Sequence, residues 1–267
     1  MSTVAISSRQ VSPVRSPRRT IPLSRIVAIE LRKMFDPRSG FWLMSSIVIM
    51  ALLTTSAVLL WAPSEELTYR SFATAIGIPM TVILPLIAVL SVTSEWSQRS
   101  GLTTFALVPH RGRVIAAKAI SCITVAVVSI PFAFAIGALG NVLASSLGGF
   151  EPVWDMSLGN LLTIVLANVL ALMVGFMLGV LIRSSAGALA AYFVYAFLLP
   201  TLALLLATSQ DWFADLRPWV DFDYARNALI EGALTAQQWT QLGVTGTIWL
   251  VAPMVVGLGL VVRAEVK

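Results

Sequence analysis

Residues 40 to 61 read GFWLMSSIVIMALLTTSAVLLW and contain no charged side chain. A stretch of about 20 apolar residues is long enough to cross the hydrocarbon core of a bilayer as an α-helix. Five further stretches of this kind follow, so that the predicted spans are residues 40–61, 72–93, 119–144, 158–182, 186–208 and 242–262. We therefore expect an all-α polytopic membrane protein with six transmembrane helices.

The composition of the whole chain agrees with this prediction. Of the 267 residues, 57% are hydrophobic and only 12% are charged, which is about half the charged fraction of a typical soluble domain. We expect residues 22–267 to form one transmembrane domain, since no segment between the spans is large enough for a soluble domain. Residues 1–21 are rich in Ser, Arg and Pro, which is typical of a disordered basic tail.

Basic residues are divided unevenly between the two sides of the predicted bundle. Fifteen of the 18 Lys and Arg residues fall in the N-terminal segment, in residues 94–118, at Arg183 and in the C-terminal segment. The positive-inside rule therefore predicts that these segments and both termini are cytoplasmic. A positive inner face suits an anionic lipid bilayer as partner and gives no reason to invoke nucleic acid.

Two segments outside the spans are typical of the membrane interface. Residues 22–36 predict an amphipathic helix on the cytoplasmic leaflet, with Arg25, Arg32 and Lys33 turned away from its apolar face. That face consists of Leu23, Ile26, Val27, Leu31, Met34 and Phe35. Residues 210–239 carry three Trp among several acids, and we expect them to form short helices that cap the outer mouth.

The predicted spans contain no Asp, Glu, Lys, Arg or His. Ion-coupled carriers and intramembrane enzymes use ionisable groups at membrane depth, so both classes are disfavoured. No Gly-x-x-x-x-Gly-Lys-[Ser/Thr] loop occurs, so we do not expect this chain to bind ATP itself, and we expect no catalytic residue, cofactor or metal. The Asp221-x-Asp223 pair is interpreted as solvated surface in preference to a cation site.

Polar side chains within the spans offer few candidates for a substrate path. The candidates are Asn141 and Asn168, although hydrogen bonding between helices is the commoner role of such residues. Because the spans are uncharged and mostly apolar, they predict a hydrophobic or amphiphilic cargo such as a drug, peptide or lipid.

Residues 95–118, EWSQRSGLTTFALVPHRGRVIAAK, hold the only histidine and a dense group of charges between two spans. Gly101 and Pro109 bracket a segment that predicts a short helix parallel to the membrane. Its apolar residues Leu102, Phe105 and Leu107 could dock into a groove of a cytoplasmic partner. A hairpin that lies on lipid headgroups explains the same residues equally well.

The order and spacing of residues in this connection resemble the first cytoplasmic loop of type 2 ATP-binding-cassette (ABC-2) permeases, the membrane subunits of many bacterial exporters. The residues that carry the resemblance are Glu95, Gly101, Leu102, Thr103, Leu107, Pro109, Arg111 and Lys118. The resemblance covers nearly the whole chain from about Pro22, because it includes the amphipathic segment, the six spans and the sequence RSSAGA that begins at Arg183.

In that family the segment that matches residues 102–108 is a coupling helix, which docks on a separate cytoplasmic ATPase subunit. The resemblance implies that Phe105 and Leu107 are docking residues and that Glu95 and Arg99 join the second span to the helix. The full set of implied coupling residues is Glu95, Arg99, Gly101, Leu102, Thr104, Phe105, Leu107, Pro109 and Arg111.

The resemblance further implies that residues 22–267 are an ABC-2 type permease domain in a bacterial plasma membrane. Two permease chains would assemble with two ATPase chains, which would bind the ATP. The sequence thus predicts the permease subunit of an ATP-driven exporter. The alternative is a membrane-anchored regulatory or scaffolding subunit that binds a cytoplasmic partner through the same loop without transporting anything.

Overall fold

The computed structural model describes residues 21–36, 38–97, 111–232 and 234–263, and this part of the chain contains helices and connections but no strand. Six helical segments there are long and apolar enough to cross a membrane: Gly40–Trp61, Tyr69–Ser94, Gly112–Gly148, Leu158–Ile182, Ser185–Ser209 and Ala236–Val261. The predicted all-α fold with six spans is confirmed, and the chain is a multi-pass membrane protein.

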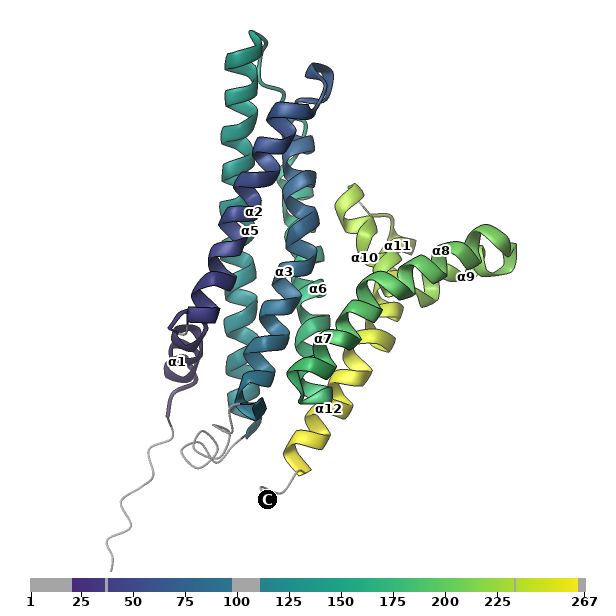
Figure 1. Ribbon diagram of the computed structural model, residues 1–267. Coiled ribbons are helices and arrows are strands. Elements are labelled where there is room, and N and C mark those ends of the chain that lie inside the picture. Colours follow the sequence, from purple (N-terminus) through teal and green to yellow (C-terminus); the bar gives the residue numbers. More distant parts are fainter. Residues whose placement is uncertain (1–20, 37, 98–110, 233, 264–267) are drawn as a thin grey trace, which may run out of the picture.

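In chain order the helices are α1 (Leu23–Phe35), α2 (Arg38–Trp61), the 3₁₀ turn η1 (Ser64–Glu66), α3 (Tyr69–Ser97), α5 (Arg111–Gly148), α6 (Leu158–Ile182), α7 (Ser185–Phe193), η2 (Val194–Leu198), α8 (Leu199–Ser209), α9 (Asp211–Val220), α10 (Phe222–Glu231), α11 (Ala236–Gly246), η3 (Thr247–Val251) and α12 (Ala252–Arg263). The helices α2, α3, α5 and α6 pack side by side, while α8 and α9 project away from them (Figure 1).

The fifth and sixth spans each contain one π-helical turn, η2 and η3. Pro200 and Pro253 lie just beyond these turns. Because proline has no N–H to donate to the carbonyl four residues earlier, the helix widens locally instead of keeping its regular ladder.

The central helix of the bundle is α3, which packs against α2, α5 and α6. Its contact with α6 is especially close at Gly175, where a Cβ atom would lie 2.5 Å from the main-chain oxygen of Pro85. Glycine lets the two backbones approach to this distance because it carries no side chain. The large buried side chains of this core include Phe72, Leu84 and Phe176.

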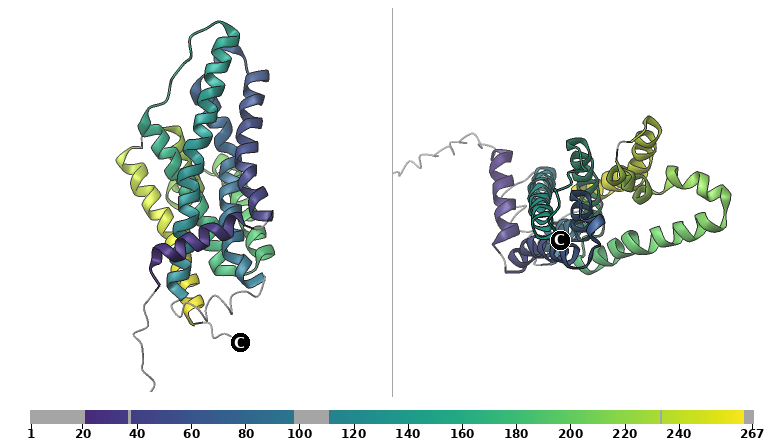
Figure 2. Two further views of the ribbon diagram at one scale, coloured as in Figure 1. Left: turned by 90° about the vertical axis from the view of Figure 1, so that its left-hand side faces the viewer. Right: turned by 90° about the horizontal axis from the view of Figure 1, so that it is seen from above.

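The amphipathic helix α1 lies across the end of the bundle at which α3 ends and α5 begins (Figure 2). Ile26 and Met34, from the predicted apolar face, are buried in the bundle. Leu23 and Phe35 from the same face remain exposed. Between the two buried apolar residues, one helical turn from each, lies Glu30, which is buried as well.

The third span differs from its prediction. Residues 119–144 were expected, but α5 contains 38 residues, from Arg111 to Gly148, and is about 57 Å long at 1.5 Å per residue. Arg113 and Lys118 lie within the first eight residues of this helix, before the predicted span begins. The helix is longer than the ~30 Å hydrocarbon core, so it continues beyond the predicted span, and a charged side chain such as Lys118 does not end it because a partner stabilises the charge.

Residues 210–239 form short helices, as predicted. These are α9, α10 and the start of α11, and α10 packs along α6. The indole N–H of Trp249 donates a hydrogen bond of 2.7 Å to the main-chain oxygen of Val220 and so ties this segment to the sixth span.

Candidate functional site

Most of the predicted coupling residues lie outside the described part of the chain. Glu95 belongs to α3 and Arg111 begins α5. The remaining members, Arg99, Gly101, Leu102, Thr104, Phe105, Leu107 and Pro109, fall outside the described residues, as does the predicted coupling helix that they would form. The structure does describe how the two helices that flank this connection are held.

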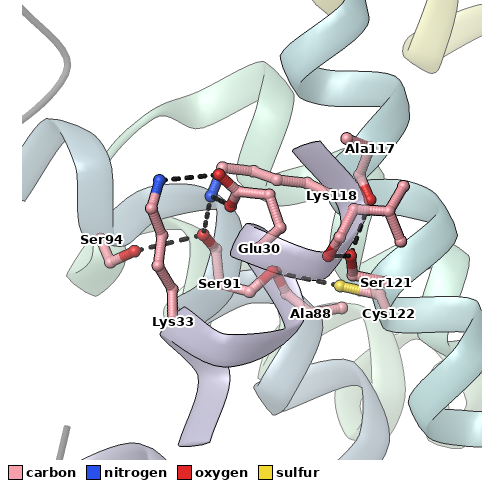
Figure 3. Close-up of polar contacts among 10 residues, drawn as sticks. Glu30, Lys33, Ala88, Ser91, Ser94, Ala117, Lys118, Ser121 and Cys122 are labelled. Carbon is pink, nitrogen blue, oxygen red and sulfur yellow. Dashed lines mark hydrogen bonds and ion pairs between the residues drawn. The ribbon is translucent and has the colours of Figure 1, made fainter. Parts of the chain in front are cut away.

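The ends of α1, α3 and α5 meet in a group of polar side chains that point toward one another (Figure 3). Lys118 of α5 forms an ion pair with Glu30 of α1 and donates a hydrogen bond of 3.2 Å to the main-chain oxygen of Ser91 in α3. The side chains of Glu30 and Lys118 are only 4% and 6% exposed. We call Glu30, Ser91 and Lys118 the three-helix brace.

Neighbouring groups complete the hydrogen bonding of the brace. The second carboxylate oxygen of Glu30 accepts a bond of 2.7 Å from Lys33. Ser121 of α5 donates to the main-chain oxygen of Val27 in α1 at 3.3 Å, which adds a second link between these helices. Buried charges are tolerated when they are paired and hydrogen-bonded, and both carboxylate oxygens of Glu30 meet this condition.

The brace has a mechanical consequence and no evident chemical one. A single ammonium group contacts two other helices at once, so α1, α3 and α5 cannot separate at this point without exposing a buried charge. Removing one partner from such a pair is strongly destabilising, because the other charge is left buried and uncompensated. The helices on either side of residues 98–110, α3 and α5, are therefore joined to each other and to α1 by the brace.

The two predicted substrate-path residues lie in different surroundings. Asn141 of α5 is fully buried and donates a bond of 3.1 Å to the main-chain oxygen of Val153 in the α5–α6 connection. The main-chain N–H of Tyr69 donates to the same oxygen. Asn141 thus holds this connection in place and does not line the cavity described next.

Asn168 of α6 lines a cavity of about 260 Å³ between α3, α6, η2 and α10. Its amide nitrogen donates a bond of 2.9 Å to the main-chain oxygen of Ile164, within its own helix. Its amide oxygen is buried and has no hydrogen-bond partner among the described residues. The same holds for the hydroxyl of Tyr195, which lines the cavity from η2.

A second buried ion pair lies beside this cavity. Arg226 of α10, whose side chain is 7% exposed, bonds to Asp223 at 2.6 Å and to the main-chain oxygen of Ala167 in α6 at 3.5 Å. Asp221 accepts a bond from the N–H of Tyr224 at the start of α10 and pairs with Arg217.

The interpretation of Asp221 and Asp223 as solvated surface is therefore wrong. Asp223 pairs with Arg226, three residues later on the same helical face. Asp221 pairs with Arg217, four residues earlier at the end of α9. Packing of α10 on α6 shields most of the Asp223–Arg226 pair from solvent, and the Tyr224 ring covers Arg217 of the other pair. Within the described residues, no three His, Cys, Asp or Glu side chains come together as a metal site.

Sequence reasoning named Lys118 and Asp223 but missed both pairings, and it singled out neither Glu30 nor Arg226. One signal was available for Glu30, which shares a helical face with Ile26 and Met34 at four-residue spacing. Nothing local indicated Lys118 as its partner, because the two residues are 88 positions apart.

No protein-family model matches the chain. No curated protein shows significant similarity to it.

Proposed function

We propose that this chain is the permease subunit of an ATP-binding-cassette transporter in a bacterial plasma membrane. Both termini and the α3–α5 connection would be cytoplasmic, as the distribution of Lys and Arg predicts. A separate ATPase subunit would supply the energy, and a second permease chain would complete the pathway. The cargo would be hydrophobic or amphiphilic and would be exported.

The observation that carries this proposal is the three-helix brace. A coupling segment transmits force only if the helices that it pulls do not yield at their ends. Lys118 holds the first turns of α5 to α1 and to α3, close to both ends of the 98–110 connection. A push on this connection would then move three helices as one unit.

The displacement would be transmitted from the 98–110 connection to the interior of the bundle by α3. This helix runs from the brace at Ser91 to the cavity, which it lines between Ala73 and Val82. ATP hydrolysis in the partner would displace Phe105 and Leu107, and α3 would carry the displacement to the cavity wall. The fifth and sixth spans leave most of their side chains uncovered within one chain, so lipid or the second permease would cover them.

Copurification tests the proposal. The chain is purified from its native membrane in mild detergent, as wild type and with Phe105→Asp or Leu107→Asp, and bound ATPase activity is measured. Val153→Asp is the matched control, because Val153 is an exposed apolar residue in the connection at the other end of α5. ATPase should accompany the wild type and the control and be lost from both loop variants, because a charge cannot enter an apolar groove without a large desolvation penalty.

Purification of the chain alone in several mild detergents, with the loop variants indistinguishable from wild type, would overturn the proposal. The regulatory alternative needs a second measurement, since it predicts the same copurification. ATP-dependent uptake of an amphiphilic dye into inside-out vesicles that contain the purified complex separates the two. A complex that hydrolyses ATP but moves no amphiphile would favour the regulatory role.

A further inference from the structure

The cavity between α3, α6, η2 and α10 is lined by both polar and apolar side chains. Its volume is about 260 Å³. Ile78 of α3 and Phe197 of η2 line it and are largely exposed, so they form the rim. At Gly77, beside this rim, a Cβ atom would meet nothing within 4 Å.

Two residues that line the cavity each carry a buried polar atom that has no partner among the described residues. These atoms are the amide oxygen of Asn168, whose residue is 1% exposed, and the hydroxyl oxygen of Tyr195. A buried polar group left unpaired costs about 1–3 kcal/mol. Native proteins leave few such groups, and two of them on residues that line one cavity favour a ligand that would complete their hydrogen bonding.

The hydrogen-bonding capacity of these groups defines the head group that fits. The oxygen of Asn168 only accepts, so it requires a donor, whereas the Tyr195 hydroxyl can donate or accept. The nearby Tyr192 hydroxyl already donates to the main-chain oxygen of Thr81 at 2.7 Å. A ligand hydroxyl or primary amide, which donates and accepts at once, matches the pair Asn168 and Tyr195.

The charges beside the cavity argue against an ionic head group. Asp223 and Arg226 bond to each other, and Asp223 accepts a further bond from Asn227 at 3.0 Å. Their charges cancel, so neither an anion nor a cation meets an unbalanced countercharge at this wall. A neutral head group avoids the desolvation penalty that a charged one would carry into the site.

The apolar rim fits an alkyl chain. Ile78 and Phe197 stand at the mouth, while Ala73, Val82 and Ala171 line the interior. A chain that leaves the cavity between Ile78 and Phe197 would pass directly to the apolar surroundings of the spans.

We propose that this cavity binds a neutral amphiphile through a hydroxyl or amide head group, with Asn168 accepting from it and Tyr195 donating to it. The alkyl chain of the ligand lies across the rim. Only the identification of the ligand as cargo rests on the proposed transport function. Binding of the ligand itself requires no ATPase.

Binding is tested with the full chain in phosphatidylcholine nanodiscs, without any ATPase. The probe is radiolabelled 1-oleoylglycerol, and methyl oleate, which has the same acyl chain but no hydrogen-bond donor, is the comparison ligand. The variants are Tyr195→Phe and Asn168→Leu. Tyr224→Phe is the matched control, because Tyr224 is an exposed residue of α10 that packs on Arg217 and does not line the cavity.

We expect saturable binding of 1-oleoylglycerol and at least tenfold weaker binding of methyl oleate. Each cavity variant should weaken binding of 1-oleoylglycerol about fivefold, the usual effect of one hydrogen bond, and the control should not. The melting temperature of the empty Tyr195→Phe variant should not fall, since the hydroxyl that it loses has no partner among the described residues.

Equal binding of the two esters, or unchanged binding in both cavity variants, would overturn the inference. A lower melting temperature of empty Tyr195→Phe would do the same, because the hydroxyl would then serve the fold. Loss of the ATPase in the copurification experiment would leave these results unaffected, so the two proposals fail separately.

Discussion

Replacement of Lys118 by Met removes the charge at the centre of the three-helix brace while keeping a side chain of similar length. The structure gives Lys118 an ion pair with Glu30 and a hydrogen bond to Ser91, both in buried surroundings. After the replacement, the Glu30 carboxylate keeps only its bond of 2.7 Å to Lys33, whose side chain is 45% exposed. The carboxylate remains buried because α1 still packs on α5.

Removing one partner of a buried ion pair costs about 3–5 kcal/mol. We expect about 3 kcal/mol here, at the lower end, because Lys33 still compensates part of the charge. Since 1.4 kcal/mol corresponds to a factor of ten, detachment of α1 should become roughly 100-fold more frequent. The effect should be local, because the brace holds the end of the bundle and not the α3–α6 core.

Hydrogen exchange of the purified chain in nanodiscs measures this detachment. Backbone amides of α1 should exchange about two orders of magnitude faster in Lys118→Met, while those near Phe176 in α6 should change little. Arg32→Met is the matched control, because Arg32 is 81% exposed and its pair with Asp36 is a surface pair, which contributes at most about 1 kcal/mol.

The double variant Glu30→Met with Lys118→Met decides whether the buried charge is the cause. Replacement of a whole buried pair by apolar side chains is often neutral or stabilising, so protection of α1 should return. The reasoning would be refuted if Lys118→Met resembled the Arg32 control, or if the double variant exchanged faster than the single one.

Two further predictions concern the framework. Gly175→Ala should destabilise the chain by about 1–3 kcal/mol, because the new Cβ would lie 2.5 Å from the main-chain oxygen of Pro85. Thermal unfolding measures this loss of stability. The control variant Gly259→Ala, in which nothing lies within 4 Å of the new Cβ, should unfold at the wild-type temperature. Trp249→Phe should weaken the attachment of α9 and α10 to the sixth span by about 1 kcal/mol, because it removes the hydrogen bond to Val220. The backbone amides of these two helices should then exchange faster. Unchanged exchange would contradict the expectation.

The spans could be predicted because the length of an apolar run can be measured directly along a sequence. Residues 40–61 and 158–182 match the structure residue for residue. The start of the helix that carries the third span could not be placed, since the sequence shows Lys118 as a charge and does not show the acid that neutralises it. Only tertiary packing brings Glu30, 88 residues away, to the same point.

The candidate sites show the same division between local and tertiary information. Asn168 could be singled out as a polar residue within a span, and it does line a cavity. Tyr195 could not, because a lone aromatic residue in an apolar span is typical of packing. The pairing of Asp223 with Arg226 follows from their spacing, but its burial depends on the contact between α10 and α6.

The helix α3 joins the two proposed sites, and its prolines help to explain how. Pro85 has no N–H, so the carbonyl of Thr81, four residues earlier, lacks its usual helical partner. That carbonyl accepts the hydroxyl of Tyr192 from α7 at 2.7 Å instead. The Thr81 carbonyl, which lacks its helical partner, thus links α3 to the fifth span, and Tyr195 lies one turn after Tyr192 in that span.

The same helix reaches the three-helix brace at Ser91, ten residues beyond Thr81 and about 15 Å along the axis. A displacement of the brace would therefore be felt at the wall of the cavity, and a ligand that fixes this wall would resist the displacement. Coupling between two binding events is reciprocal. If both proposals hold, the amphiphile in the cavity must alter the affinity of the chain for its ATPase by the same factor by which the docked ATPase alters the affinity for the amphiphile.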